Sequence, residues 1–254
     1  SHIRYPKGAD AALISDISAS IINDVFPTDA ELQQVLDNPV VKLNLVVAKA
    51  RRISSVRHKL LQAGVLTLAA SANLVHRKHL QHFFQRVLFH CPGDESPFHY
   101  AGILPTQHVA LNQHNLRQAV LASGAIPMVL NPVENIAGAG QGLYYDGGVT
   151  DYHFDLPFTD NGLVLYPHFY PHLTPGWFDK ALSWRRAKPA HLHNVVLLCP
   201  TDSWVASLPF GKIPDRNDFK LPDAVRINYW QEVITRSHEL AEAFARGHYQ
   251  VEAL

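Results

Sequence analysis

The stretch that decides the fold is Leu143-Tyr144-Tyr145-Asp146-Gly147-Gly148-Val149, in which an aromatic segment runs into an Asp-Gly-Gly turn. Tyrosines favour a strand, and glycine lets the backbone turn sharply because it has no Cβ to clash. Asp146 is therefore expected at the carboxyl end of a strand, the edge where α/β sheets usually build their sites. A carboxylate placed there can act as a general base toward a hydroxyl group. The alternative interpretation is an ordinary Asp-Gly turn that only ends a strand.

A second element lies upstream and reads Ala122-Ser123-Gly124-Ala125-Ile126-Pro127, followed by the apolar run Met128-Val129-Leu130 and by Asn131-Pro132. Together the two elements, carried by residues 121–156, resemble the second half of the patatin-like phospholipase family. In that family an Asp of a D-G-[GA] element is the orienting base of a Ser–Asp dyad. The resemblance implies that Asp146 is the catalytic acid/base residue and that Gly147 and Gly148 form the loop that supports it.

The resemblance also implies a fold and a substrate. The family fold is a modified α/β-hydrolase sandwich that cleaves acyl esters of lipids, so a lipid or acyl-ester substrate and no cofactor are expected. The family's G-x-S-x-G nucleophile motif and its glycine-rich oxyanion loop do not occur in the 254 residues. We therefore expect residues 1–254 to be a single α/β domain, the C-terminal portion of a patatin-like domain with its C-terminal extension. The serine nucleophile would then lie upstream, and this chain alone is predicted to be inactive.

Ser123 is the serine most easily mistaken for a nucleophile. It ends a helical pattern that begins near Asn112, so no strand leads into it and it does not form a nucleophile elbow. Small neighbours also flank three other serines, but none has paired glycines: Ser18, Ser20 and Ser71. No nucleophile is assigned in this chain. The alternative function is a non-catalytic patatin-like domain that lacks the dyad and binds lipid or a protein partner.

Composition narrows the class of protein. Hydrophobic residues make up 47% of the chain and charged residues 17%, which is typical of a globular protein. The formal net charge is zero, which argues against nucleic-acid binding. Cys91 and Cys199 each end an apolar run before a proline, which favours buried thiols over a disulfide and weakly favours a cytoplasmic location.

The chain contains sixteen histidines, and histidine is a common metal ligand. His76, His79 and His82 recur at every third position, which would allow a tri-histidine site. A solvated, weakly basic helix face explains the same spacing, and no carboxylate or cysteine accompanies the other histidines at zinc spacing. No metal is predicted.

Strands alternate with helices along the chain, which predicts a largely parallel sheet flanked by helices. Helical pieces are expected over 10–36, broken at Pro27, with Thr28 and Asp29 beginning the second piece. A final helix is expected over 228–245. Strands are predicted over 43–48, 85–90, 162–166 and 194–198, and a brief extended piece is expected over 108–111.

An apolar helical stretch over 56–80 contains the uncharged run Gln62–Val75, which is too short to cross a bilayer. It is followed by Arg77 and Lys78, so it predicts either a core helix or an interfacial helix in peripheral contact with a membrane. The aromatic loop over 167–178 is the rival membrane candidate. The expected lack of N-terminal strands predicts an exposed sheet edge, and hence self-association or association with the missing N-terminal segment.

Overall fold

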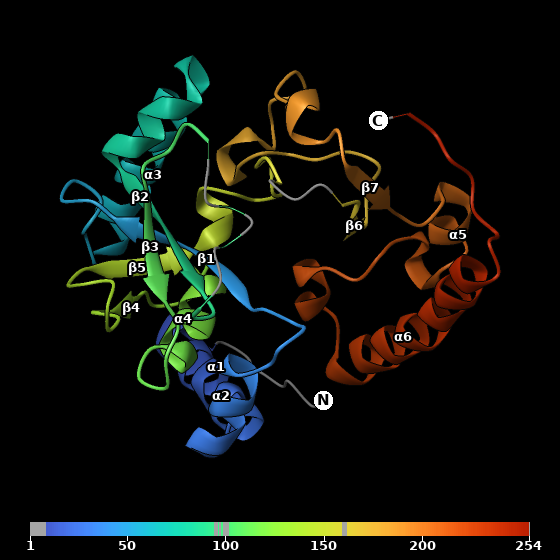
Figure 1. Ribbon diagram of the computed structural model, residues 1–254, viewed down its shortest axis with the longest axis horizontal. Coiled ribbons are helices and arrows are strands. Elements are labelled where there is room, and N and C mark those ends of the chain that lie inside the picture. Colours follow the sequence, from blue (N-terminus) through green and yellow to red (C-terminus); the bar gives the residue numbers. More distant parts are fainter. Residues whose placement is uncertain (1–8, 94–95, 97, 99–101, 159–161, 254) are drawn as a thin grey trace. The chain divides into compact units, whose positions relative to one another are not determined.

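The computed structural model describes residues 9–93, 96, 98, 102–158 and 162–253 (Figure 1). Contacts group the chain into two compact units, and the single domain expected over residues 1–254 stays a prediction. The larger unit comprises the described residues of 5–161 and 173–193, and the smaller unit those of 162–172 and 194–254.

The larger unit is built on a five-stranded sheet with the strand order β3-β2-β1-β5-β4. Its central strand β1 (Asn44–Ala50) pairs with β2 (Phe84–His90) on one side and with β5 (Leu143–Asp146) on the other. The edges of the described sheet are β3 (Thr106–Ala110) and the two-residue β4 (Val133–Glu134). The fold is therefore mixed α/β with a sheet flanked by helices, as predicted.

The strand directions correct the expectation of a largely parallel sheet. In the larger unit the pairs β1–β2, β1–β5 and β4–β5 are antiparallel, and only β2–β3 is parallel. The sheet is mixed because β1 and β2 are consecutive strands that pair antiparallel even though α3 (Lys59–Val75) lies between them. Short apolar strands carry no signal for direction, so the alternation of strands and helices alone gave the wrong orientation.

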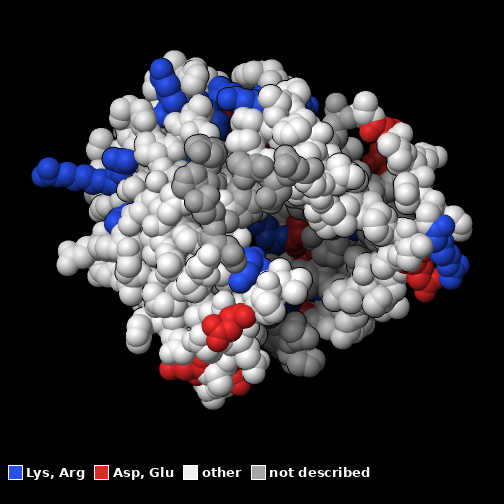
Figure 2. All heavy atoms as spheres, viewed as in Figure 1, with Lys and Arg blue, Asp and Glu red and all other residues white. Residues whose placement is uncertain are grey.

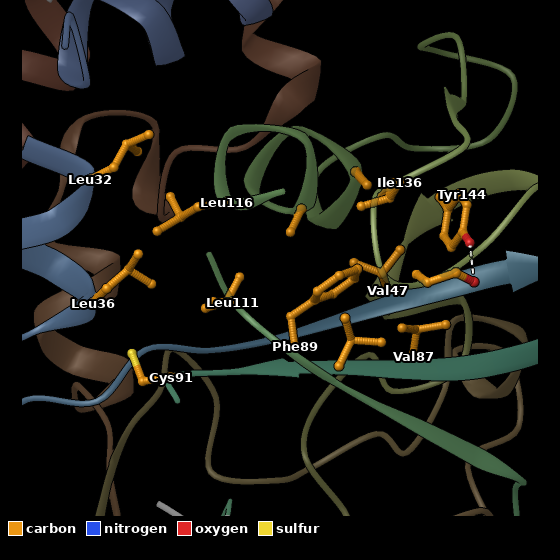
Figure 3. Packing of buried hydrophobic residues seen from close by; sticks show 14 residues of the cluster. Leu32, Leu36, Val47, Val87, Phe89, Cys91, Leu111, Leu116, Ile136 and Tyr144 are labelled. Atoms are coloured by element: carbon orange, nitrogen blue, oxygen red, sulfur yellow. Dashed lines mark hydrogen bonds between the residues drawn. The ribbon is translucent and has the colours of Figure 1, made fainter. Parts of the chain in front are cut away.

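Helices cover the two faces of this sheet. On one face, α2 (Asp29–Leu36) and α4 (Leu116–Ser123) pack on a core that includes Val47, Phe89 and Tyr144. Figure 3 shows these side chains converging, with the Tyr144 hydroxyl donating to the Ala139 carbonyl at 2.7 Å. Burial raises the pKa of Tyr144 to about 12. On the other face, α3 packs on a second core that includes Ala48 and Tyr145, as the side-chain alternation of a strand requires.

The helix break predicted at Pro27 is confirmed. Helix α1 (Ala11–Val25) ends before it, and α2 begins after Thr28. Thr28 and Glu31 form a capping box: the Thr28 side chain accepts from the Ala30 N–H at 3.2 Å, and Glu31 accepts from the Thr28 N–H at 3.0 Å. The start of α4 differs from the prediction: Asn115 rather than Asn112 occupies the N-cap position, and Asn112 instead caps the preceding turn by accepting from the His114 N–H.

The smaller unit contains the parallel strand pair β6 (Val164–Pro167) and β7 (Val195–Leu198), close to the predicted strands. Its helices α5 (Asp202–Ala206) and α6 (Asp223–Ala245) share a core of Leu208, Tyr229 and Val233. The other described elements are short 3₁₀ helices. The larger unit contains η1 (Arg77–His82), η2 (Gly147–Val149), η3 (Trp177–Asp179) and η4 (Pro189–His191), and the smaller unit contains η5 (Pro209–Gly211) and η6 (Arg216–Lys220).

Candidate active site

The Asp-Gly-Gly element lies where the sequence predicts it, at the end of strand β5. Asp146 is the last residue of that strand and pairs with Val47 of β1. Its backbone N–H donates to the Ala125 carbonyl at 3.0 Å. The contact joins the Ala-Ile-Pro element to the Asp-Gly-Gly element, so the two motifs that carry the family resemblance form one local structure.

The two glycines of this element have distinct steric roles. A Cβ on Gly147 would lie 2.1 Å from the Val46 carbonyl oxygen, far inside van der Waals contact with the backbone of β1. A Cβ on Gly148 would lie 2.9 Å from Oδ1 of Asp146. The first glycine therefore lets η2 pass against the sheet, and the second lets the carboxylate fold back over the turn.

The Asp146 carboxylate is half-buried and fixed by its own turn. Its Oδ1 accepts from the Gly148 N–H at 2.6 Å. Burial raises the pKa of Asp146 above its ordinary value, and the Gly148 N–H and the positive charge of Lys180 offset part of that rise. Lys180 is held beside the turn, with its Nζ 3.7 Å from the centroid of the Tyr152 ring. A carboxylate with a raised pKa is a stronger base than a solvated one.

A buried ion pair stands directly behind the turn. Asp151 accepts two hydrogen bonds from Arg86 of β2, each at 2.6 Å, and both side chains are almost fully excluded from solvent. Arg77 lies 3.6 Å from the same Asp151 carboxylate and donates to the carbonyls of Thr150 and Pro175. Arg86 of β2 and Arg77 of η1 therefore hold residues 150–151, which follow the Asp-Gly-Gly turn.

The network continues to Asp179 at the end of η3. Asp179 pairs with Arg77 at 3.0 Å and accepts from Asn73 of α3 at 2.6 Å, and the guanidinium of Arg185 lies 3.7 Å away. Asp179 precedes Lys180 in the chain. The position of Lys180 beside Asp146 is thus set by a buried carboxylate with three polar partners.

The serines considered in the sequence occupy helices. The Ser123 hydroxyl donates to the Val120 carbonyl at 2.7 Å, at the end of α4. Ser18 and Ser71 bond to carbonyls of their own helices in the same way, and Ser20 lies within the regular turns of α1. Hydroxyl bonds of this kind, from Ser18, Ser71 and Ser123 to carbonyls of their own helix, are common for serines within helices.

The three histidines of the metal hypothesis lie at the end of α3 and in η1. The ring centroids of His76 and His79 are 6.0 Å apart, and those of His79 and His82 are 6.3 Å apart, because side chains three residues apart eclipse in a 3₁₀ helix. Among the described residues no group of three potential metal ligands is found. Cys91 and Cys199 are free thiols; Cys91 is buried, as predicted, and Cys199 is partly exposed.

Sequence reasoning found Asp146 and its glycines but missed Lys180 and the Arg86–Asp151 pair. One signal for the pair was present: Arg86 is the only charged residue in the apolar run 83–89, and a charge in a buried strand needs a partner. Nothing in the local sequence around Lys180 points to Asp146.

Comparisons with known proteins give no match for this chain among protein-family models, curated proteins or solved structures. Within the described part of the chain, every helix is too short or too polar to cross a membrane. The aromatic loop proposed as a lipid contact is divided between the units: Phe169 and Tyr170 belong to the smaller unit, whereas Trp177 and Phe178 pack against the second core of the larger unit.

Proposed function

We propose that this chain is the C-terminal portion of a patatin-like serine acyl hydrolase, a phospholipase or lipid esterase in which Asp146 is the acid/base residue of a Ser–Asp dyad. The observation that carries the proposal is the hydrogen bond from the Asp146 N–H to the Ala125 carbonyl, at 3.0 Å. This bond directly joins the Ala-Ile-Pro motif to the Asp-Gly-Gly motif, the two motifs on which the resemblance depends. The serine is proposed to lie outside these 254 residues, because no G-x-S-x-G motif occurs within them.

In the proposed reaction the carboxylate of Asp146 takes the proton from the serine hydroxyl as the serine oxygen attacks the ester carbonyl. The proton passes to the departing alcohol, which leaves an acyl-serine. Asp146 then takes a proton from water, whose oxygen attacks the acyl carbon, and the proton returns to the serine as the carboxylic acid leaves. The raised pKa of Asp146, caused mainly by burial, supports this role.

The test is the variant Asp146→Asn in the complete protein. Loss of a positioned acid/base residue is expected to lower kcat by about 100-fold or more. Turnover close to wild type would remove Asp146 from the mechanism, whereas absence of turnover in the complete wild-type protein would favour the non-catalytic lipid-binding domain. The 254-residue chain alone is expected to hydrolyse no short-chain nitrophenyl ester and to resist a serine-directed fluorophosphonate, and stoichiometric labelling of one of its serines would contradict an external nucleophile.

Location and association are also proposals. A cytoplasmic protein that contacts membranes peripherally would suit a lipid substrate. Strands β3 and β4 form the edges of the described sheet, and an uncovered edge can pair with another strand. We therefore expect the chain to self-associate or to bind a further N-terminal segment, and a monodisperse monomer by light scattering would contradict this.

A further inference from the structure

Helix α3 has two apolar faces, and the described residues of the larger unit cover one of them. The inner face buries Ala69 and Asn73 and partly buries Leu66 against the second core. The outer face exposes five large apolar side chains that no described part of the larger unit covers: Leu60 (78% exposed), Leu61 (59%), Leu68 (60%), Leu74 (54%) and Val75 (76%). A helix of 17 residues is about 25 Å long, so these side chains form an extended apolar stripe.

The outer face is also free of polar groups that would resist an apolar surrounding. It carries no charged side chain between Leu60 and Val75. Its two hydroxyl groups bond to the helix itself, from Thr67 to the Ala63 carbonyl at 2.9 Å and from Ser71 to the Thr67 carbonyl at 3.0 Å. Burial of a hydroxyl costs little when its hydrogen bond is already made.

Cations stand at both ends of this stripe. Arg51, Arg52 and Lys59 precede or begin α3, Lys78 follows it, and all four are exposed. From residue 38 to residue 93 the sequence has nine lysines and arginines and no aspartate or glutamate. Three of the nine, Arg57, Arg77 and Arg86, pair with carboxylates from elsewhere in the larger unit. Figure 2 shows the corresponding gathering of blue side chains on the side of the molecule where α3 lies in Figure 1.

Two helices rich in carboxylates lie on the opposite side of the sheet. Residues 9–41, which form α1 and α2, contain six carboxylates and no lysine or arginine. Helix α2 packs on the core of one sheet face and α3 on the core of the other, so the acidic helix α2 and the apolar helix α3 with its flanking cations lie on opposite sides of the sheet. The carboxylates of α1 and α2 are therefore kept away from the cations that flank α3, and one of them, Asp29, pairs with Arg117 at 3.2 Å.

We propose that the outer face of α3 docks on an anionic lipid surface, with Leu61 and Leu68 entering the interface and the flanking cations contacting phosphate headgroups. An apolar stripe bordered by basic residues is the arrangement of interfacial helices. A second copy of the chain fits this face poorly, because a symmetric pair of α3 helices would bring two basic borders together. The docking itself needs no catalysis, but its role in presenting substrate rests on the proposed hydrolase function.

The experiment measures binding of the chain to vesicles of phosphatidylcholine alone and of equal parts phosphatidylcholine and phosphatidylserine. Wild type is expected to bind the anionic vesicles more tightly, and increasingly so as salt is lowered. The double variant Leu61→Gln, Leu68→Gln should weaken binding by about 100-fold, since each buried leucine contributes about tenfold. The matched control Val40→Gln, Val41→Gln changes two exposed apolar residues outside α3 and should bind as wild type.

A second variant tests the charges and does not depend on the leucine changes. Arg51→Gln, Arg52→Gln, Lys59→Gln should weaken binding to the anionic vesicles by about 100-fold, since each cation near such a surface contributes about fivefold. Equal binding of wild type to both vesicle types, or no effect of either variant, would overturn the proposal. A dimer that the leucine variant dissociates, without vesicle binding, would overturn it in favour of a second copy.

The variant Asp146→Asn separates this inference from the proposed function. It should bind anionic vesicles as wild type does, because Asp146 lies at the end of β5 and not on the outer face of α3. Vesicle binding together with unimpaired turnover of Asp146→Asn in the complete protein would leave the docking surface in place and reject the catalytic role. Loss of vesicle binding in Asp146→Asn would count against the assignment of the lipid contact to α3.

Discussion

The substitution Gly147→Ala should be among the most destabilising single changes in this chain. The added Cβ would lie 2.1 Å from the Val46 carbonyl oxygen and 2.6 Å from its carbonyl carbon. A carbon and an oxygen normally stay more than about 3 Å apart, so η2 and β1 would have to separate by about 1 Å. Overpacking that a side-chain rotation can relieve costs about 1–3 kcal/mol, and here the obstacle is backbone. We expect the free energy of unfolding to fall by about 3 kcal/mol or more.

Two further Gly→Ala changes serve as matched controls. In Gly148→Ala the new Cβ meets Oδ1 of Asp146, the movable end of a side chain, so the carboxylate can turn away at a cost of about 1 kcal/mol. In Gly64→Ala nothing lies within 4 Å, and replacing a glycine inside α3 should stabilise by about 0.5–1 kcal/mol. Urea unfolding followed by circular dichroism measures all three. If Gly147→Ala unfolds at the same urea concentration as Gly64→Ala, the close approach of η2 to β1 is wrong.

Three other changes test the site and its supports. Burial raises the pKa of Asp146 in the folded state, so the protein loses stability as pH rises from the unfolded-state pKa through the folded-state pKa and the carboxyl group ionises. Asp146→Asn should therefore raise Tm at neutral pH but not at a pH well below 3.8. An equal gain in Tm at both pH values would contradict a destabilising buried charge. Arg86→Met should cost about 3 kcal/mol, because it removes both short hydrogen bonds of the buried Asp151 carboxylate and leaves it only the more distant Arg77; adding Asp151→Asn should restore part of that loss in a double-mutant cycle. Thr28→Ala removes the N-cap of α2 and should lower the free energy of unfolding by about 1 kcal/mol. It should leave unchanged the pH dependence of Tm that Asp146 causes.

Local features of the fold were predictable because local chemistry determines them. Pro27 and Thr28 marked the break between α1 and α2, and the tyrosines before Asp146 marked β5. Pairing directions were not predictable, since the same apolar strand fits a parallel or an antiparallel neighbour. The antiparallel pairing of β1 and β2 depends on the whole sheet.

The candidate site divides in the same way. Asp146 and its glycines are adjacent in sequence, so a motif could identify them. Lys180 and Arg86 reach the Asp-Gly-Gly turn only through the tertiary fold, and no short pattern encodes such a contact.

Helix α3 shows a different limit of sequence reasoning. Because both of its faces are apolar, periodicity alone could not separate a core helix from an interfacial one, and the structure makes Leu66 part of the core and Leu68 part of the outer face. The buried Asn73 was the available clue to the inner face, since a polar side chain in an apolar helix needs a partner. A Leu66→Asp variant would therefore test folding, and a Leu68→Asp variant would test lipid contact.

The buried network behind the turn has an evolutionary consequence. Arg86, Asp151, Arg77 and Asp179 satisfy one another in a region with little access to water. Loss of one member leaves an uncompensated charge, whereas replacement of a whole pair by apolar residues of similar volume can be nearly neutral. Substitution of these residues one at a time therefore passes through variants of lower stability. In a set of related chains, Arg86 and Asp151 are expected to be retained or replaced together, while the exposed cations around α3 vary one at a time.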